Sequence, residues 1–181
     1  AAFAPGIRIL NQDPWEALCC FILSQNNNIP RIRGIVDRLC RSFGDPLPES
    51  GERDFSFPGP DRLAGLAPED LAPLRCGFRA RYLLDAAEKT ARSLSLEDLR
   101  ELPVEESRQA LMGILGVGRK VAGCTLLYGL HRLEVFPVDV WIRRALDVLF
   151  PGKTAESFGP YGGIAQQYIF HYSRLHPELF S

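Results

Sequence analysis

The sequence predicts an all-α protein, organised as one compact multi-helix domain over residues 1–181. Three observations support this fold class. Apolar residues recur at helical spacing, the periodic segments begin at proline or at polar capping residues, and no segment alternates convincingly between apolar and polar residues as a half-buried strand would. An apolar content of 46% is sufficient for a real hydrophobic core. We expect about ten short helices packed into a bundle.

The predicted helices of the first half begin at a polar cap or at a first-turn proline. Asp13-Pro14 is the clearest example, because it combines both signals ahead of an apolar run. Three asparagines then break the pattern and cap a second helix, which ends at Gly44. The expected helices span about 14–25, 30–44, 60–66 and 67–74, with a loop rich in proline, glycine and serine over 45–60.

Glycine and proline also separate the helices of the second half. Gly77 permits a tight entry into a long amphipathic helix that ends near Ser93, and Ser95 caps a short helix. Pro103 opens the helix that leads into a glycine-rich hairpin at about 111–123. Further helices are expected over 140–150 and after the segment Gly159-Pro160-Tyr161, and only 133–138 suits an extended conformation.

The composition limits the classes of function. A net charge of −1 argues weakly against nucleic acid as a partner, because DNA-binding domains are often basic. The arginines nevertheless occur in pairs near helix starts and loops, where they either bind phosphate or form a solvated surface. No run of 18 apolar residues occurs, so no membrane span is expected. The N-terminus lacks the features of a signal peptide.

The five cysteines indicate neither a disulfide framework nor a zinc site. Their number is odd, none forms a Cys-x-x-Cys pair, and the three histidines show no useful spacing with them. A reducing compartment is therefore expected.

The hairpin L-G-V-G-R-K, residues 115–120, is a predicted anion site. Gly116 and Gly118 allow the backbone N–H groups around Val117 to approach a ligand closely. A helix that begins near Gly118 presents free N–H groups and the positive end of its dipole to a phosphate. The spacing is not that of a P-loop. Taken alone, the hairpin fits many noncatalytic proteins as well.

Lys120 and Asp139 add candidate chemistry to the hairpin. Lys120 falls in the first turn of the second helix, where the dipole disfavours a charged amine, and an uncharged amine can form a Schiff base. The alternative is a surface lysine that binds phosphate. Asp139, 19 positions later, caps the next helix. The carboxylate either does only that or also supplies acid–base or electrostatic catalysis.

The combination of L-G-V-G-R-K with V-D after 19 residues resembles the helix–hairpin–helix DNA glycosylase superfamily. The resemblance implies that Lys120 is the nucleophile, which attacks the sugar carbon of a damaged nucleotide, and that Asp139 is the catalytic carboxylate. It also implies that Gly116, Val117 and Gly118 bind the DNA backbone.

Further motifs resemble one branch of that superfamily, the 8-oxoguanine DNA glycosylases. The segment S-Q-N-N-N-I-P-R-I implies that Asn26 and Arg31 contact the cytosine opposite the lesion, since an amide and a guanidinium can fork onto an exposed base edge. The segment G-F-R-A-R-Y implies that Phe78 wedges into the base stack and that Arg79 contacts the orphaned base. The alternatives are a helix cap, core packing and a plain surface charge.

The remaining motifs imply a pocket for the flipped base. Cys124 lies four residues after Lys120, on the same helix face, and Gln166 and Phe170 are again four apart. In the resembled branch the cysteine packs against the base and pairs electrostatically with the lysine, the phenylalanine stacks on the base, and the glutamine binds its polar edge. The alternative is a buried cysteine, a core phenylalanine and a surface glutamine.

The resemblance thus implies a monomeric enzyme that flips 8-oxoguanine out of double-stranded DNA, removes it where it lies opposite cytosine, and cleaves the abasic site. The compartment is one with DNA, either the nucleus of a eukaryote or the cytoplasm and nucleoid of a prokaryote. No iron–sulfur cluster is expected, because no cysteine follows Cys124. A structural cation is implied on the backbone carbonyls of Met112, Ile114 and Val117.

Two departures from that branch stand out. Its members usually carry an N-terminal β-rich domain, which is absent from this sequence, and Trp141 stands where they often have a phosphate-binding histidine. Two alternatives remain open. One is a glycosylase for another oxidised base, such as a pyrimidine. The other is a noncatalytic helix–hairpin–helix DNA-binding module, which would not need a lysine paired with a carboxylate.

Overall fold

The computed structural model describes residues 3–47 and 54–180 and confirms the all-α prediction. Over these residues the only β feature is an isolated bridge between Pro46 and Phe55. The α-helices are α1 (Pro14–Ser24), α2 (Ile29–Phe43), α3 (Pro60–Leu63), α4 (Arg79–Arg92), α5 (Val104–Met112), α6 (Arg119–Tyr128), α7 (Val140–Leu149) and α8 (Gly162–Leu175). The 3-10 helices are η1 (Ala72–Leu74), η2 (Asp98–Arg100), η3 (Ala155–Tyr161) and η4 (Pro177–Phe180).

Polar caps begin the helices where the sequence predicted them. Asp13 Oδ1 accepts a hydrogen bond from the Glu16 N–H at 2.8 Å, and Asn28 Oδ1 accepts one from the Arg31 N–H at 3.0 Å. Asp139 does the same for α7. Each cap satisfies an N–H group that the first turn leaves without a helical partner.

Two expected short helices are smaller than predicted. The segment 60–66 is helical only over α3, and 67–74 is helical only over η1, with hydrogen-bonded turns between them. The first segment leaves the helical conformation at Ala64, which is extended and precedes Gly65 at a φ of +83°, and Pro68 and Pro73 limit a regular helix in the second. The segment 133–138 forms no strand. Its Leu133 carbonyl instead accepts a hydrogen bond from the Gly163 N–H at 2.7 Å, which joins this segment to the start of α8.

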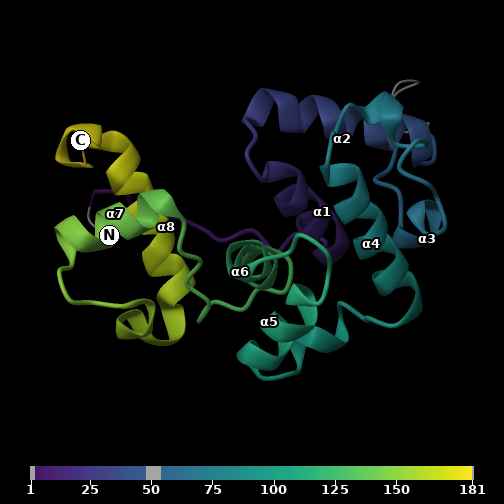
Figure 1. Cartoon of the computed structure of the whole chain (residues 1–181). Coiled ribbons are helices and arrows are strands. Elements are labelled where there is room, and N and C mark those ends of the chain that lie inside the picture. The colour runs from purple at the N-terminus through teal and green to yellow at the C-terminus, as the bar shows by residue number, and fades with distance from the viewer. Residues whose placement is uncertain (1–2, 48–53, 181) are drawn as a thin grey trace.

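The buried apolar residues form two clusters, which follow one another along the chain. The larger cluster draws on helices α1 to α6 and includes Leu18, Leu83 and Leu126. The smaller cluster is built from α7, α8 and η4, with Phe136, Ile142 and Ile169 among its buried members. Figure 1 shows α7 and α8 on one side of the molecule, α1, α2 and α4 on the other, and α6 between them.

A close approach of backbones holds α6 against α1. A Cβ on Gly129, just after α6, would lie 3.0 Å from the Pro14 Cα and 3.1 Å from the Ala17 Cβ. Glycine permits this approach, since a Cβ here would make contacts tighter than most real Cβ atoms do. The contact fixes α6 in the centre of the molecule, with its first turn directed toward solvent.

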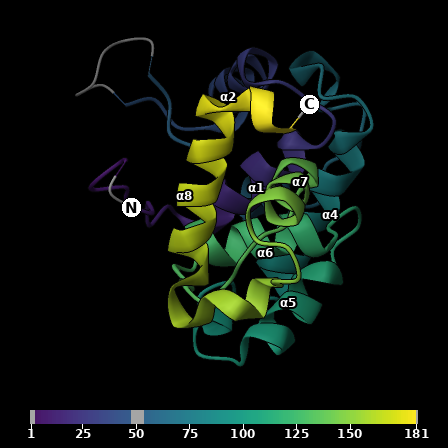
Figure 2. The ribbon, with the colours of Figure 1, turned by 90° about the vertical axis from the view of Figure 1, so that its left-hand side faces the viewer.

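The start of the described chain lies beside α8, as Figure 2 shows. The ring of Phe3 meets Tyr172 edge-on at 5.3 Å between centroids and stacks on His171 at 6.1 Å. Phe3 also lines an apolar cavity of about 600 Å³ between α7, η3 and α8. None of the helices described is long and apolar enough to cross a membrane.

Candidate active site and nucleic-acid interface

The hairpin between α5 and α6 has the conformation that its glycines predicted. Gly116 adopts a φ of +77°, which disfavours any residue with a side chain. A Cβ at this position would also lie only 2.4 Å from the ring of Tyr82 on α4. Gly118 has extended backbone and is the N-cap of α6. The turn is therefore packed against α4, and the first N–H groups of α6 point outward.

An ion pair on α4 braces the same turn. Asp85 Oδ2 accepts a hydrogen bond from the Leu115 N–H at 2.6 Å and a second from Lys89 Nζ at 2.8 Å. Lys89 Nζ also donates to the Gly113 carbonyl at 2.6 Å. These contacts satisfy backbone groups that would otherwise lack partners.

The structure gives mixed support for the implied cation. Carbonyl oxygens such as those of Met112, Ile114 and Val117 are suitable ligands for a hard cation. However, the Ile114 carbonyl already accepts a hydrogen bond from the Val117 N–H at 3.1 Å, and the ammonium of Lys89 lies on the neighbouring Gly113 carbonyl. The positive charge of Lys89 at this turn repels a metal cation and so disfavours its binding there. The cation stays a prediction.

Lys120 lies in the first turn of α6, as predicted, and is exposed. Its Nζ is 5.6 Å from the ring centroid of Phe21 on α1. The aromatic face attracts a cation and gives the flexible lysine a preferred direction. Lys120 therefore lies at the rim of the contact between α1 and α6.

Cys124 lies one turn deeper than Lys120, and its thiol is buried. Burial raises the pKa of Cys124 to about 11, with Asp139 adding to the rise and Lys120 opposing it. The thiol is therefore protonated at neutral pH. The expected electrostatic pairing with the lysine would then involve the dipole of a neutral thiol, and it stays a prediction.

Asp139 caps α7 through Oδ1, which accepts a hydrogen bond from the Ile142 N–H at 2.8 Å. The predicted capping role is thus confirmed. Its carboxylate also acts on the pKa values of both Cys124 and Tyr128, so it lies on the same side of α6 as these two residues. One carboxylate oxygen is committed to the cap, and the other is available for a ligand.

Lys120 lines a cavity of about 420 Å³ between the two clusters of the molecule. The walls come from α5, the first turn of α6, the segment 134–138, α7 and η3. Charged residues of both signs surround it, namely Arg108, Arg119, Arg143, Glu134 and Glu156. Cys124, Gln166 and Phe170 do not line this cavity, so the structure does not join the expected base-binding side chains to the space beside the lysine.

Gln166 is buried, with 7% of its surface exposed, and both ends of its amide are hydrogen-bonded. Its Nε2 donates to the Pro137 carbonyl at 3.2 Å, and its Oε1 accepts from Gln167 Nε2 at 2.6 Å. Phe170 is half-buried and packs against the smaller apolar cluster. Both residues are held in defined positions on α8, but the contacts described are with protein.

Asn26 and Arg31 are both exposed, as side chains that contact a nucleic acid must be. Asn26 adopts a φ of +46° at the turn between α1 and α2, is exposed, and has no partner for its side-chain amide among the described residues. Arg31 is also exposed. Its guanidinium makes only a 3.4 Å contact with the Arg75 carbonyl. Both groups are accessible to a ligand.

Phe78 is 46% exposed at the start of α4, which excludes the alternative of core packing. Arg79 was expected either to be a plain surface charge or to contact the orphaned base. In this structure its side chain is not exposed for either. It is 2% exposed, and its guanidinium donates to the carbonyls of Gln25, Asn26 and Cys76. The guanidinium also lies 4.4 Å from the Phe78 ring centroid. In this structure Arg79 holds the turn at Asn26 and lies beside Phe78, and its contact with the orphaned base stays a prediction.

Trp141 is 41% exposed in the first turn of α7, and two guanidinium groups lie near its ring. Arg144 is 5.9 Å and Arg174 5.7 Å from the ring centroid. Neither arginine forms an ion pair among the described residues. Trp141 stands where the resembled branch often has a histidine, and Arg144 belongs to the adjacent pair Arg143-Arg144. Arg174 comes from α8, and no sequence motif contains it.

Three residues beside the site, Phe21, Tyr128 and Gln167, belong to none of the sequence motifs. The rings of Phe21 and Tyr128 lie 5.4 Å apart at a tilt of 31°. Burial raises the pKa of Tyr128 to about 12, Cys124 and Asp139 add to the rise, and a hydrogen bond with Gln167 opposes it. Tyr128 lies eight residues after Lys120. Tyr128 follows Cys124 by four residues, as Cys124 follows Lys120. This repeated spacing is the signal in the sequence that places Tyr128 on the same helix face.

The fold and the site define a class. A helix–hairpin–helix unit, a lysine at the start of its second helix and a carboxylate at the start of the next helix are the arrangement expected of a DNA glycosylase. The model of the HhH-GPD superfamily of base excision DNA repair proteins matches residues 19–157. The chain belongs to this superfamily.

Individual relatives agree with this assignment. An N-glycosylase/DNA lyase of Saccharomyces cerevisiae is 40% identical over 152 residues, which are 77% of this chain and 40% of the yeast protein. The structure of MBOgg1 with a low-affinity DNA ligand matches with a TM-score of 0.90 at 43% identity, over 97% of this chain and 65% of that one.

A third relative has been solved with DNA. The 8-oxoguanine glycosylase/lyase of Clostridium acetobutylicum, in complex with double-stranded DNA containing cytosine opposite 8-oxoG, matches with a TM-score of 0.87 at 35% identity. The alignment covers 97% of this chain and 64% of that one. The chain therefore spans between 40% and 65% of the length of these three relatives.

Proposed function

We propose that this chain is the helical catalytic part of an 8-oxoguanine DNA glycosylase/lyase. The observation that carries the proposal is that Lys120, on the first turn of α6, and Asp139, at the cap of α7, both act on the pKa of one buried thiol, Cys124. A noncatalytic hairpin module would have no use for this arrangement. The name of the structurally similar Clostridium acetobutylicum relative, an 8-oxoguanine glycosylase/lyase, supports the choice of 8-oxoguanine.

In the proposed reaction, the damaged nucleotide is flipped out of the duplex, at a cost of a few kcal/mol. The lone pair of Lys120 Nζ then forms a bond to the sugar anomeric carbon, and the base leaves with the electrons of the glycosidic bond. The carboxylate of Asp139 stabilises the positive charge that develops on the sugar. Loss of a proton from Nζ and opening of the ring give a Schiff base. Loss of a proton from the adjacent carbon then expels the 3′ phosphate.

The proposed partner is double-stranded DNA with 8-oxoguanine opposite cytosine, bound by a monomer. The N–H groups around Gly116–Gly118 grip a phosphate. Asn26 and Arg31 are accessible to the cytosine, and Phe78 to the gap that the flipped base leaves. The proposed compartment is the nucleus of a eukaryote or the cytoplasm and nucleoid of a prokaryote.

Borohydride trapping tests the mechanism. The wild type and Lys120→Gln are incubated with duplexes that carry 8-oxoguanine opposite cytosine, an abasic site, or no lesion. We expect a covalent adduct with the lesion duplex for the wild type and none for the variant, because an amide cannot form a Schiff base. Lys120→Gln should still bind DNA. Lys153→Gln, on a different segment, is the matched control and should still give the adduct.

The other outcomes separate the alternatives. An adduct with the abasic duplex alone would mean that the lysine reacts but that the chain does not remove 8-oxoguanine. An adduct on a duplex carrying an oxidised pyrimidine instead would assign a different lesion. No adduct with any duplex, from a folded protein that binds DNA, would favour the noncatalytic module.

A further inference from the structure

A continuous set of side-chain contacts runs around the buried thiol of Cys124 and connects the two sides of the site. It begins at Lys120, whose ammonium lies over the ring of Phe21, and continues through the ring contact of Phe21 with Tyr128. Tyr128 is hydrogen-bonded to Gln167. Each of these contacts joins a different helix to the next, from α6 to α1, back to α6 and then to α8.

The second half of this set leads back to the catalytic carboxylate. Gln167 Nε2 donates to Gln166 Oε1 at 2.6 Å, and Gln166 Nε2 donates to the Pro137 carbonyl at 3.2 Å. Pro137 lies two residues before Asp139. Gln167 thus links Tyr128 on α6 to Gln166 on α8.

These bonds fix the orientation of the Gln166 amide. A rotation of that amide by half a turn would place its NH2 group against the NH2 of Gln167 and its oxygen against the Pro137 oxygen. Both contacts would then be repulsive, and a buried amide cannot replace the lost hydrogen bonds with bonds to water. The direction in which Gln166 presents its polar edge therefore depends on the residue beside it.

We propose that Gln167, held by Tyr128, is a positioning residue that sets the amide orientation of Gln166 for recognition of the flipped base and couples α8 to α6. This role rests on the proposed function, because it requires that Gln166 meet the base. Gln167 acts through Gln166 and need not touch the base. This positioning role predicts that removal of the base depends on Gln167, whereas the reaction of Lys120 with an abasic sugar does not.

Two conservative substitutions test this role. Gln167→Glu keeps the shape of the side chain but removes the N–H donor to Gln166 Oε1, and Tyr128→Phe removes the hydroxyl but keeps the ring contact with Phe21. Gln109→Glu, on the exposed face of α5 and bonded to Glu105, is the control. Two rates are measured for each protein: single-turnover excision of 8-oxoguanine opposite cytosine, and cleavage of a preformed abasic duplex.

We expect Gln167→Glu and Tyr128→Phe each to slow excision about tenfold, as the loss of one positioned hydrogen bond would. Cleavage of the abasic duplex should stay within about twofold of wild type, and Gln109→Glu should change neither rate. Unchanged excision in folded Gln167→Glu would overturn the proposal, and so would an equal loss of both rates, which indicates general disruption. A wild type that cleaves the abasic duplex but leaves 8-oxoguanine in place would refute the proposed function instead, and this role with it.

Discussion

Burial decides what several single residues of the site can do. Arg79 belongs by sequence to an exposed aromatic–arginine pair, yet its guanidinium is enclosed and bonded to carbonyls of the α1–α2 turn. An arginine with several carbonyl acceptors is a structural clamp, because its planar fork of donors is satisfied without a ligand. Cys124 shows the same principle for a thiol, since burial rather than the nearby lysine sets its protonation state.

The buried thiol predicts a loss of stability at alkaline pH. The pKa of Cys124 rises from 9.0 to about 11 on folding, so the folded state holds its proton more tightly than the unfolded state. The stabilisation is complete below pH 9 and is lost as the pH rises through 11. We expect about 2 kcal/mol less stability at pH 10.5 than at pH 8.5 from this group.

Urea denaturation of the wild type and Cys124→Ala at the two pH values measures this term. The variant is expected to lose about 2 kcal/mol less than the wild type over the interval. Cys20, whose pKa is also raised to about 11, contributes equally to both proteins and cancels in the comparison. Identical losses in the two proteins would show that the Cys124 thiol does not titrate as described.

At the scale of secondary-structure elements, α4 supports the hairpin that carries the site. Tyr82, Asp85 and Lys89 lie on one face of α4 and contact Gly116, the Leu115 N–H and the Gly113 carbonyl in turn. A turn with this much support is set before any ligand arrives, which lowers the ordering cost of binding. The two glycines of the hairpin differ in this respect, because only Gly116 faces α4.

The difference predicts unequal effects of alanine. Gly116→Ala must place a side chain at φ +77° and within 2.4 Å of the Tyr82 ring, so we expect a destabilisation of about 2–4 kcal/mol. Gly118→Ala meets nothing within 4 Å and has an ordinary φ of −96°, so it should cost less than about 1 kcal/mol. Urea denaturation gives both values, and equal costs would contradict the packing of Gly116 against α4.

Local signals in the sequence were sufficient for much of the fold and for part of the site. Caps such as Asp13, Asn28 and Asp139 act within one turn, so the residue alone marks the helix start. The positions of Lys120 and Cys124 on one helix face follow from helical spacing. Arg79 and Gln166 could not be assigned in this way. Their partners lie 54 and 29 residues away along the chain, and only the tertiary fold places those carbonyls against them.

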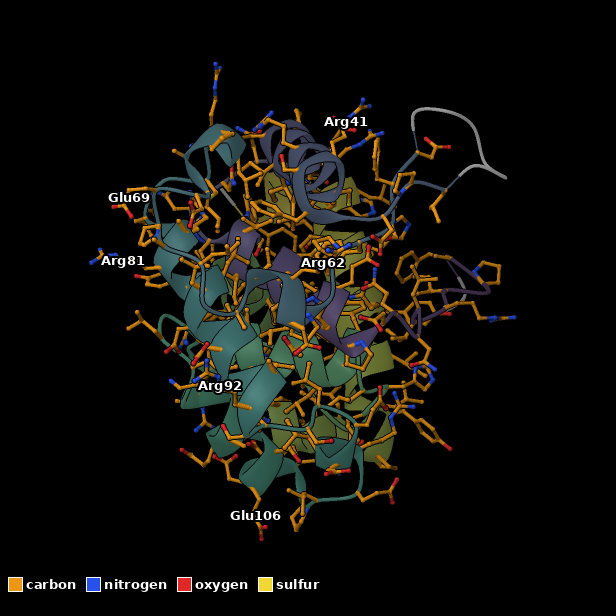
Figure 3. All side chains as sticks on the ribbon, turned by 90° about the vertical axis from the view of Figure 1, so that its right-hand side faces the viewer. Arg41, Arg62, Glu69, Arg81, Arg92 and Glu106 are labelled. Atoms are coloured by element: carbon orange, nitrogen blue, oxygen red, sulfur yellow. The ribbon has the colours of Figure 1, made fainter. Side chains whose placement is uncertain are left out.

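At the scale of the whole molecule, the net charge is −1, and the arginines differ in whether an acidic residue is paired with them. Arg144 and Arg174 flank Trp141 without acidic partners among the described residues, next to the first turn of α7. On the opposite face, shown in Figure 3, the arginines include Arg41 and Arg92, which are paired with Asp37 and Glu88. Unpaired arginines near the site favour a phosphate backbone more than paired ones do.

This asymmetry predicts how DNA binding responds to salt. Replacing Arg144 and Arg174 by glutamine should reduce the slope of log K against log salt by about 2, provided that each arginine neutralises one phosphate. The double replacement of Arg41 and Arg92 changes the net charge equally and should leave the slope nearly unchanged. Fluorescence anisotropy with an undamaged duplex between about 50 and 200 mM salt measures both. Equal effects of the two pairs would argue against a contact at Trp141.

The order of the two apolar clusters along the chain has a consequence for synthesis. Every buried member of the larger cluster precedes residue 136, and every member of the smaller cluster follows residue 135. A ribosome adding about 5–20 residues per second completes the larger cluster several seconds before the last helices exist. Lys120 and Cys124 are therefore in place on a nascent chain that still lacks Asp139 and Gln166. Closure of the site by α7 and α8 then follows formation of the larger cluster, and the nucleophile gains its carboxylate only after α7 has been synthesised.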